Sequence, residues 1–227
     1  MSRVQRTAVV TGGAGGIGQA IVRALSASGH DVATLDREGE FAVDLADEQD
    51  VRGIAERLGP RDVLVHAAAA FDRASLGDLD LATWRHVQAV NVESALWLCQ
   101  ALTPAMSARG FGRIIFIASN TVWRPPAADF LPYVASKATL IGIARALAKP
   151  LGEHAITVNC VAPGLTRTPF TQANLPPQAF EDVRVRQAVP RSLLPEDTAA
   201  LVAFLASDAA GAITGQSLVA DGGSTMH

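Results

Sequence analysis

Aromatic residues, cysteine and net charge are all scarce in this sequence of 227 residues. Aromatic residues make up 5% of the chain, and Tyr133 is its single tyrosine. The two cysteines, Cys99 and Cys160, lie in apolar segments, so we expect small buried thiols and neither a disulfide framework nor a metal site. The net charge of −3 offers no strongly basic surface, which argues against nucleic acid or an anionic membrane as a partner.

Long hydrophobic runs are missing as well. No apolar stretch reaches the ~20 residues that a membrane-spanning helix needs. The first residues, MSRVQRTAVVTGG, pass directly into a strand pattern and lack the apolar segment of a secretory signal. We therefore expect a cytoplasmic protein with no membrane partner.

Short apolar runs alternate with helical stretches along the whole chain. Runs that are apolar throughout are typical of strands buried on both faces, and this alternation predicts a parallel sheet covered by helices on both sides. No repeat or linker divides the sequence, so residues 1–227 are expected to form a single α/β domain. The expected strands are residues 7–11, 31–36, 62–67, 113–119, 155–162 and 217–221, and the expected helices are residues 16–27, 48–58, 83–108, 133–152 and 195–206.

Two segments depart from this regular pattern. Residues 36–44 are too few to hold a helix between the second and third strands, which predicts a shortened edge of the sheet. Residues 163–194 are rich in Pro, Thr, Gln and Arg and carry no clear periodicity. Irregular segments of this length are usually lids or binding loops, so we expect a substrate lid around residues 165–194.

A glycine-rich turn, VVTGGAGGIGQAI, joins the first expected strand to the first expected helix. Gly12, Gly16 and Gly18 stand where the chain must turn sharply, approach a ligand closely and pack the helix on the strand, and a Cβ would obstruct each of these. The amides at the start of the helix favour phosphate. The turn therefore predicts a dinucleotide site.

Asp36 lies at the end of the second expected strand, 18 residues after Gly18. A carboxylate there can accept hydrogen bonds from the adenosine ribose and repels a 2′-phosphate, which favours NAD over NADP. Gly15 offers no cation for such a phosphate, whereas the neighbouring Arg37 could reach one and leaves NADP open.

The stretch LPYVASKATL places Lys137 four residues after Tyr133, on the same face of a helix. Alone, this pair indicates a half-buried tyrosine beside a solvated lysine. Beside a dinucleotide site it suggests acid/base chemistry. A phenol with a pKa near ~10 is a poor base at neutral pH, but an ammonium group and a positive nicotinamide would lower that pKa.

Taken together, these motifs resemble the short-chain dehydrogenase/reductase family over nearly the whole chain. TGGAGGIG is similar to the cofactor motif of the family, and Ser119, Tyr133 and Lys137 are similar to its catalytic set. The resemblance implies a doubly wound Rossmann sheet of about seven strands, NAD as cofactor, a small-molecule substrate and commonly a homotetramer. The cofactor-binding residues it implies are Gly12, Gly16, Ile17, Gly18, Asp36, Asp44, Leu45, Ala69, Tyr133, Lys137, Pro163, Gly164, Thr166 and Thr168.

The resemblance also implies a role for each catalytic residue, and none of these roles needs a metal. Tyr133 would be the acid/base, and Ser119 would hold the substrate oxygen, with Thr121 a weaker candidate for that task. Lys137 would anchor the nicotinamide ribose and lower the pKa of the phenol. Asn91, in AVNVES, would hold a water that continues the proton path.

One segment departs from the family pattern. His66-Ala67-Ala68-Ala69 stands where the family has Asn-Asn-Ala-Gly. This exchange removes side-chain hydrogen bonds that brace the central sheet and places the Ala69 methyl near the cofactor. We interpret His66 as a structural substitute and not as a catalytic base.

Aromatic residues near the expected site favour a hydrophobic substrate. Trp123 and Phe170, with Ser119 and Tyr133, are the expected substrate contacts, although Trp123 could instead cover the core or a subunit interface. The stretch from Ser119 to Ala148 is similar to secondary-alcohol dehydrogenases of the 1-phenylethanol type. A dihydrodiol dehydrogenase, with Arg124 serving a carboxylate, and a sugar-alcohol dehydrogenase stay open, and a non-catalytic dinucleotide-binding regulator is the alternative from another class.

The expected helix over residues 133–152 has small and apolar residues on more than one face. One face must pack on the sheet, so the other favours a helix–helix interface together with the helix at 83–108. We therefore expect a homodimer at least, and a homotetramer by the family resemblance.

Overall fold

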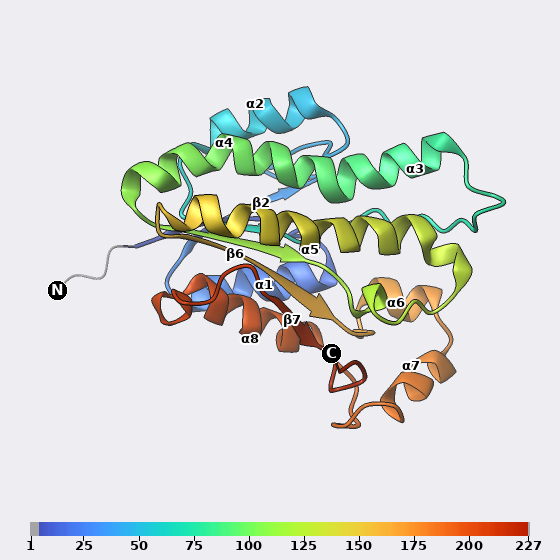
Figure 1. Cartoon of the computed structure of the whole chain (residues 1–227). Helices are drawn as coiled ribbons and strands as arrows, with labels where there is room; N and C mark the ends of the chain where they lie inside the picture. The colour runs from blue at the N-terminus through green and yellow to red at the C-terminus, as the bar shows by residue number, and fades with distance from the viewer. Residues whose placement is uncertain (1–4, 227) are drawn as a thin grey trace.

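The structure, a computed structural model, describes residues 5–226, which form one parallel sheet of seven strands in the order β3-β2-β1-β4-β5-β6-β7. The order reverses between β1 and β4, so the carboxyl ends of these strands flank a crevice at which α/β proteins bind ligands. All the strands end on the same side, towards the right in Figure 1. The strands are β1 (Thr7–Thr11), β2 (Asp31–Asp36), β3 (Phe41–Ala42), β4 (Val63–His66), β5 (Gly112–Ile117), β6 (Ile156–Pro163) and β7 (Ser217–Ala220).

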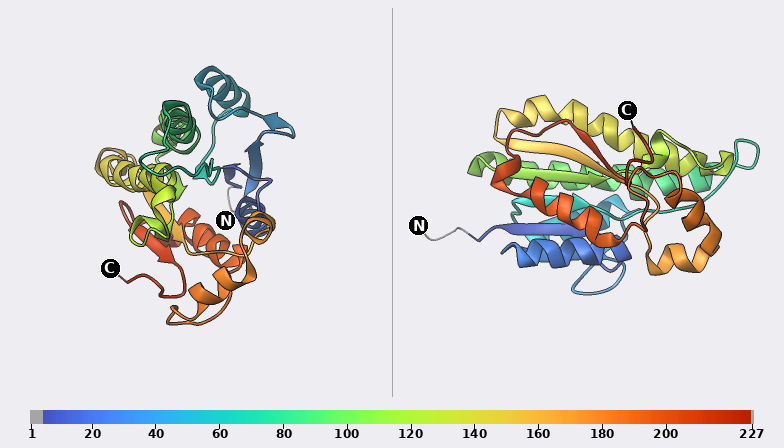
Figure 2. Two further views of the ribbon diagram at one scale, coloured as in Figure 1. Left: turned by 90° about the vertical axis from the view of Figure 1, so that its right-hand side faces the viewer. Right: turned by 90° about the horizontal axis from the view of Figure 1, so that it is seen from below.

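Helices cover both faces of the sheet, as Figure 2 shows in the view along the strands. Alternate residues of each strand enter opposite cores: Leu64 packs against one helix layer, whereas Val63 and Val65 pack against the other. This confirms the doubly wound architecture expected from the sequence. One layer holds α2 (Glu48–Leu58), α3 (Leu81–Gln88), α4 (Ser94–Arg109) and α5 (Leu131–Gly152), and the other holds α1 (Gly16–Ala27) and α8 (Pro195–Ala206).

The shortened edge of the sheet is confirmed. Strand β3 has two residues and pairs with the end of β2, and residues 37–40 between them form a bend and a turn. The next helix, α2, therefore follows β3. The Asp47 side chain caps this helix by accepting from Gln49 N and Asp50 N.

The prediction of one continuous helix over residues 83–108 is wrong. The segment begins two residues earlier, at Leu81, because the Asp80 carboxylate accepts from Thr83 N at 2.7 Å and caps α3. A π-helical turn, Ala89–Glu93, then separates α3 from α4. Apolar periodicity does not register such a turn, because the hydrogen bonds shift by one residue while the chain keeps winding.

The segment after β6 is more regular than the sequence indicated. It holds two short helices, α6 (Pro169–Asn174) and α7 (Pro177–Arg184), at the lower right of Figure 1. Each begins with a proline, which has no N–H to lose at the first turn of a helix. The proline content that predicted a loop therefore marks two helix starts, and Thr168 completes the first by accepting from Thr171 N.

Two further expectations concern the described residues. Cys99 and Cys160 are both buried free thiols, as predicted, and burial raises the pKa of each to about 12. Between residues 5 and 226, no helix combines the length and the apolarity that crossing a bilayer would demand. In the same range, no group of three or more His, Cys, Asp or Glu side chains is placed to hold a metal ion.

Candidate active site

The glycine turn after β1 is packed tightly enough to exclude side chains. Gly12 has a φ of +67°, and a Cβ there would lie 2.8 Å from Ala68 Cα. A Cβ on Gly18 would lie 2.0 Å from the carbonyl oxygen of Gly12. Both glycines are therefore required by the fold itself, and the turn brings its backbone to the floor of the crevice.

The start of α1 suits a phosphate group. Gly15 is the N-cap, and no side chain among residues 5–226 caps the helix there, so its first amides are left for another acceptor. Gly16 faces Thr168 so closely that a Cβ would lie 2.8 Å from Thr168 Cβ. Ile17 is partly buried and packs on the core between α1 and α8. The residues present thus fit the pyrophosphate of a dinucleotide.

The chain after β6 closes the other side of the crevice. Pro163 ends β6, and a Cβ on Gly164 would lie 2.7 Å from Asp221 Cβ, so this turn also needs glycine. Thr166 is buried and its hydroxyl donates to Gly164 O at 3.0 Å. These residues lie where the sequence placed the nicotinamide, and their contact with it stays a prediction.

Asp36 holds its carboxylate against the glycine turn. Asp36 Oδ2 accepts from Ala14 N at 2.9 Å, and Oδ1 accepts from Arg37 N at 2.8 Å. A cavity of about 390 Å³ lies beyond it, lined by Arg37, Asp44 and His86 among others. Leu45 sends its side chain into the core instead. Asp36 and Asp44 therefore lie at the same end of the sheet as the glycine turn, and their contact with the adenosine, like that of Leu45, stays a prediction.

Side chains of other elements hold the segment that stands in place of Asn-Asn-Ala-Gly. Ala67 N and Ala68 N both donate to Thr11 Oγ1 at 3.1 Å, and Ala70 N donates to Asn91 Oδ1 at 2.7 Å. Ala69 is exposed in the crevice, where its methyl can meet a ligand. The side chains of other elements thus supply bracing that the missing asparagines would have given.

Ser119, Tyr133 and Lys137 meet at the carboxyl ends of the strands. Lys137 is 1% exposed, and its Nζ donates to Ile117 O, the last residue of β5, at 2.7 Å. The same Nζ lies 5.6 Å from the centre of the Tyr133 ring. The Ser119 hydroxyl lies near enough to the phenol of Tyr133 to lower the pKa of that phenol by hydrogen bonding. One turn of α5 and the end of β5 therefore assemble the set that the sequence predicted.

The protein's own groups do not make Tyr133 acidic. Burial raises the pKa of Tyr133 to about 12, and the hydrogen bond from Ser119 opposes this only in part. Burial also lowers the pKa of Lys137 to about 8, because a cation is poorly solvated there. Desolvation therefore dominates the pKa of Tyr133 in the chain alone, and its depression by Lys137 together with a positive nicotinamide stays a prediction.

Ser119 is fixed by Thr121. Thr121 Oγ1 donates to Ser119 Oγ at 2.9 Å, and Thr121 N donates to the same oxygen at 3.2 Å. Ser119 thereby caps the short 3₁₀ turn Asn120–Val122. Thr121, the weaker candidate from the sequence, lies behind Ser119 and orients its hydroxyl.

Asn91 lies in the π-helical turn with its side chain fully engaged. Its Nδ2 donates to Ala70 O at 3.0 Å and to Ser136 Oγ at 2.9 Å, and its Oδ1 accepts from Ala70 N. Ser136 in turn donates to Tyr133 O at 2.7 Å. Asn91 therefore ties the chain after β4 to the start of α5, and the water predicted beside it stays a prediction.

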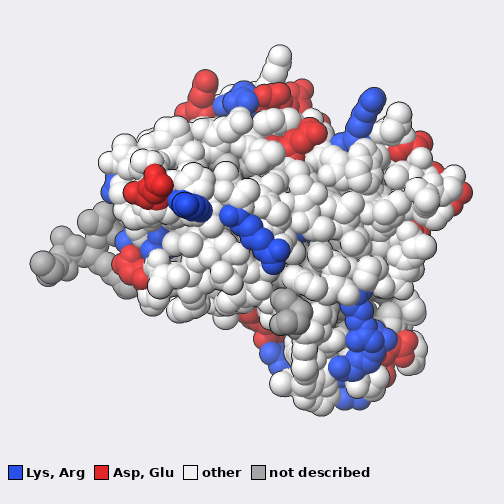
Figure 3. Space-filling view, viewed as in Figure 1, with Lys and Arg blue, Asp and Glu red and all other residues white. Residues whose placement is uncertain are grey.

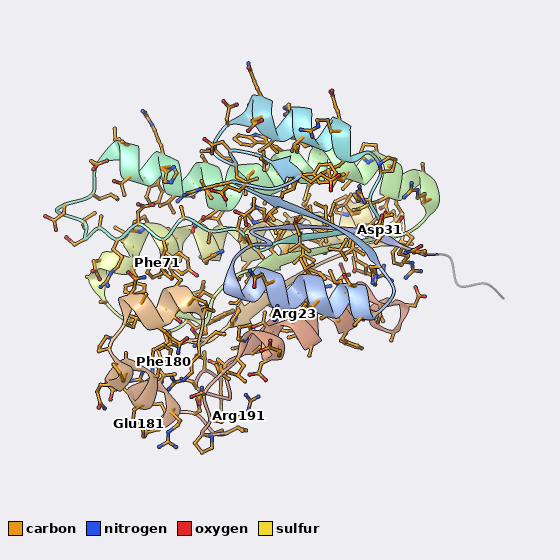
Figure 4. The ribbon with its side chains drawn as sticks, turned by 180° about the vertical axis from the view of Figure 1, so that it is seen from behind. Arg23, Asp31, Phe71, Phe180, Glu181 and Arg191 are labelled. Carbon is orange, nitrogen blue, oxygen red and sulfur yellow. The ribbon has the colours of Figure 1, made fainter. Side chains whose placement is uncertain are left out.

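An aromatic cluster that the sequence did not reveal covers Tyr133. Phe71 lies edge-on to Tyr133 with 4.7 Å between ring centres, and it also meets Phe130 at 5.3 Å and Phe170 at 6.0 Å. Figure 4 labels Phe71 beside the crevice, on the loop after β4. Its sequence position, two residues after Ala69, was the available signal, but the pairing with residues 59 and 99 positions away depends on the fold.

The other expected substrate contacts have separate fates. Phe170 is 56% exposed at the mouth of the site and joins the aromatic cluster. Trp123 packs against the core on the side of α4 and α5, which is the alternative that its sequence position left open. Phe180, in α7, is buried under the Arg167 guanidinium at 4.7 Å, and the expected lid over this segment stays a prediction.

Comparisons with known proteins agree with this geometry. A family model described as enoyl-(acyl carrier protein) reductase matches residues 12–225. A probable short-chain type dehydrogenase/reductase from Bradyrhizobium diazoefficiens is 37% identical, over 98% of this chain and 88% of the relative. A D-xylose 1-dehydrogenase from Caulobacter vibrioides is 33% identical (95% and 94% covered), and a cis-4-hydroxycyclohexanecarboxylate dehydrogenase from Sinomonas cyclohexanicum is 35% identical (97% and 97%).

A solved structure is similar over the same span. It is a candidate NAD(P)-dependent gluconate 5-dehydrogenase from Beutenbergia cavernae with bound NADP at low occupancy. Its TM-score is 0.90 at 34% identity, with 96% of each chain covered. The similarity therefore extends across the whole sheet and the crevice at its carboxyl ends.

Proposed function

The chain belongs to the short-chain dehydrogenase/reductase family, and on that premise we propose that it transfers a hydride between NAD(H) and a hydrophobic secondary alcohol or ketone. The single observation that carries this proposal is the meeting of Tyr133, Ser119 and Lys137 beside an uncapped helix start. No part of a structural core needs a phenol, a hydroxyl and a buried ammonium at one point of a crevice.

Each residue of this set has a task in the proposed reaction. Ser119 would hold the substrate oxygen and so orient its carbon. Tyr133 would take the hydroxyl proton in oxidation and return it in reduction. Lys137 would hold the nicotinamide ribose and pass the proton on. When bound, the oxidised nicotinamide supplies the hydride acceptor and a positive charge beside the phenol, which is the contribution to its pKa that the chain itself lacks.

The aromatic cluster favours an apolar substrate. Phe71 lies edge-on to the Tyr133 ring with Phe130 and Phe170 around it, so we expect a carbinol carbon at the Tyr133 hydroxyl to lie near aromatic side chains. Aromatic and alicyclic rings gain stacking contacts and buried area there, whereas each hydroxyl of a polyol would lose water without a partner. The relative named as a cis-4-hydroxycyclohexanecarboxylate dehydrogenase supports an alicyclic ring, although the substrate in that name also carries a carboxylate.

We also propose NAD as the preferred cofactor. The carboxylate of Asp36 is held at the glycine turn by Ala14 N, which is where a 2′-phosphate would have to lie. Arg37 lines the neighbouring cavity, and its guanidinium could bind the 2′-phosphate of NADP more weakly. The similar solved structure contains NADP, so the preference of this chain for NAD over NADP has to be measured.

A sugar or polyol substrate is the second candidate, because relatives at similar identity include a D-xylose 1-dehydrogenase. The two candidates differ in what the pocket must offer. A polyol needs side chains that hydrogen-bond its several hydroxyls, and a hydrophobic alcohol needs the aromatic cluster instead.

A panel of alcohols tests the proposal. NAD reduction at alkaline pH is measured with 1-phenylethanol, cyclohexanol derivatives, dihydrodiols, D-xylose and threitol. We expect aryl or alicyclic alcohols to give the highest kcat/KM, and a sugar in first place would replace the proposed substrate class. Tyr133→Phe should lower kcat by on the order of 10³-fold or more while NAD binding stays intact, and turnover within tenfold of the original chain would reject the acid/base assignment.

A further inference from the structure

His66 is a fully buried polar residue that the proposed chemistry leaves without a task. It ends β4, is 0% exposed, and lies between Thr11 of β1 and Phe116 of β5 in the sheet. Side chains alternate along a strand, and Leu64, two residues earlier, packs in the core below α4 and α5. His66 therefore points at the helix layer that carries Tyr133.

The hydrogen bonds of His66 fix its tautomer. His66 Nε2 lies 2.7 Å from Ser94 Oγ, and Ser94 Oγ donates to Val90 O at 2.7 Å. A hydroxyl has one proton to give, so Nε2 must carry the hydrogen and donate to Ser94. The ring nitrogen Nδ1 is left as an acceptor, and no described residue donates to it.

The ring stays neutral in this place. Burial first, and the charge of Lys137 second, lower the pKa of His66 to about 3. A second proton would put another cation beside a buried ammonium. His66 thus serves as a hydrogen-bond donor, and the sequence-based interpretation of it as something other than a catalytic base agrees with this geometry.

The carbonyl at the end of this chain belongs to the π-helical turn Ala89–Glu93. Val90 precedes Asn91, whose Nδ2 donates to Ser136 Oγ, and Ser136 donates to Tyr133 O. Two sets of buried hydrogen bonds, joined by the backbone between Val90 and Asn91, therefore connect the end of β4 through the turn to the first turn of α5. A π-helical turn lacks the regular bonding of an α-helix, so its shape depends on such side-chain bonds.

We propose that His66 is a positioning residue for Tyr133: by donating through Ser94 to Val90 O it holds the π-helical turn, and thereby Asn91 and the start of α5, in the geometry the acid/base needs. This inference rests on the proposed dehydrogenase function. It assigns a specific task to the histidine that replaces the family's asparagine. The shorter asparagine side chain would not place a donor at the position of Nε2.

Four single variants of the full chain, and the double variant that combines His66→Leu with Ser94→Ala, test the proposal. His66→Leu and Ser94→Ala each remove one end of the bond, and His66→Gln returns an amide donor to the position of Nε2. Cys99→Ala is the matched control for Ser94→Ala, because it also removes one buried side-chain atom from α4. It does not touch the hydrogen bonds between His66 and Tyr133.

The expected result is a loss of kcat that follows the donor. His66→Leu and Ser94→Ala should lower kcat by on the order of 10-fold to 100-fold, with KM and NAD affinity little changed, because a small misplacement of the acid/base acts on the chemical step. The double variant should be no slower than the worse single one, since both break one chain of bonds. His66→Gln should recover most of kcat, and Cys99→Ala should match the original chain.

Equal losses in His66→Gln and His66→Leu, or an unchanged kcat in Ser94→Ala, would overturn the proposal in favour of plain packing. Amide hydrogen exchange gives a readout that needs no activity. Exchange at residues 90–96 and at Ala70 should quicken in Ser94→Ala and not in Cys99→Ala. If the original chain reduces no NAD with any alcohol, the proposed function fails, while unchanged exchange in Ser94→Ala defeats the brace itself.

Discussion

At the scale of single residues, Tyr133 keeps its proton well into the alkaline range. Burial raises its pKa to about 12, and alcohol oxidation needs the deprotonated phenol, so the competent fraction grows as pH rises towards the pKa. In the complex with oxidised cofactor the pKa should fall, because a positive charge then lies beside the phenol. The direction of the pH dependence stays the same.

We therefore expect kcat for alcohol oxidation to rise between about pH 6 and pH 9, and kcat for ketone reduction to stay flat or fall over the same range. The measurement is steady-state kinetics at saturating NAD with a substrate deuterated at the carbinol carbon. A primary isotope effect shows that the chemical step is being observed. A flat oxidation profile in the presence of that isotope effect would contradict the assigned base.

The burial of Lys137 lowers the free energy of unfolding at neutral pH, because the charged ammonium is poorly solvated there. Its folded pKa of about 8 lies below the ordinary 10.5, so the unfolded chain holds the proton more tightly. The free energy of unfolding is therefore highest above pH 10.5, where Lys137 is neutral in both states. It decreases as the pH falls from 10.5 through 8, and the whole decrease is present at pH 7. The difference corresponds to roughly 3 kcal/mol.

Lys137→Met should accordingly raise Tm at pH 7 by on the order of 5 °C while abolishing turnover. The gain over the original chain should shrink between pH 8 and pH 10. Lys149→Met is the control, because Lys149 lies exposed on the same helix. A fall in Tm for Lys137→Met would mean that the hydrogen bond to Ile117 O outweighs the cost of burial.

At the scale of elements, α5 packs one face on the core and carries small side chains on its exposed face. Ala138, Gly142 and Ala146 are exposed along it, and a Cβ on Gly142 would meet nothing within 4 Å. Arg145 and Lys149 are exposed towards the end of the same helix, and Figure 3 shows basic side chains left of the centre of this side of the molecule. The small residues Ala138, Gly142 and Ala146 would let a second helix approach closely, and the homotetramer stays a prediction.

Gly142→Arg should therefore break the assembly into smaller species, because a long cation cannot be accommodated between two closely packed helices. Light scattering coupled to size-exclusion chromatography measures the mass of each species. Gly53→Arg is the matched control, since Gly53 is a helical glycine of α2 with equally open surroundings. An original chain that runs as a monomer would refute the assembly.

At the scale of the whole molecule, the cofactor site joins segments far apart in the sequence. The glycine turn meets Asp36 through Ala14 N, and it meets Thr168 beside Gly16, five residues after the end of β6. A ligand that binds only this assembled site stabilises the folded state by RT ln(1 + [L]/Kd), about 2.7 kcal/mol at 100 times Kd.

We expect NAD to raise Tm more than NADP at equal concentration, and Asp36→Ser to narrow or reverse that difference, because the repulsion of a 2′-phosphate is removed. Asp31→Ser is the control, since Asp31 lies at the opposite end of the same strand β2 (Figure 4). Thermal unfolding followed by fluorescence reads the binding without any turnover. A larger shift with NADP on the original chain would overturn the NAD preference.

The sequence by itself determined the sheet and the residues that meet at the carboxyl ends of its strands. Short apolar runs that alternate with helical stretches indicate strands buried on both faces, and the glycines and the Tyr133–Lys137 spacing act within a few residues of one another. Each of these is a local signal that needs no knowledge of distant partners.

Only the tertiary structure decided the rest. The π-helical turn at Asn91, the aromatic cover of Phe71 over Tyr133, and the link from His66 to Ser94 all join residues more than 20 positions apart or shift hydrogen bonds that leave no periodic trace. The pKa of Tyr133 was decided in the same way, because desolvation depends on everything that surrounds a group and the sequence gives only its neighbours along the chain.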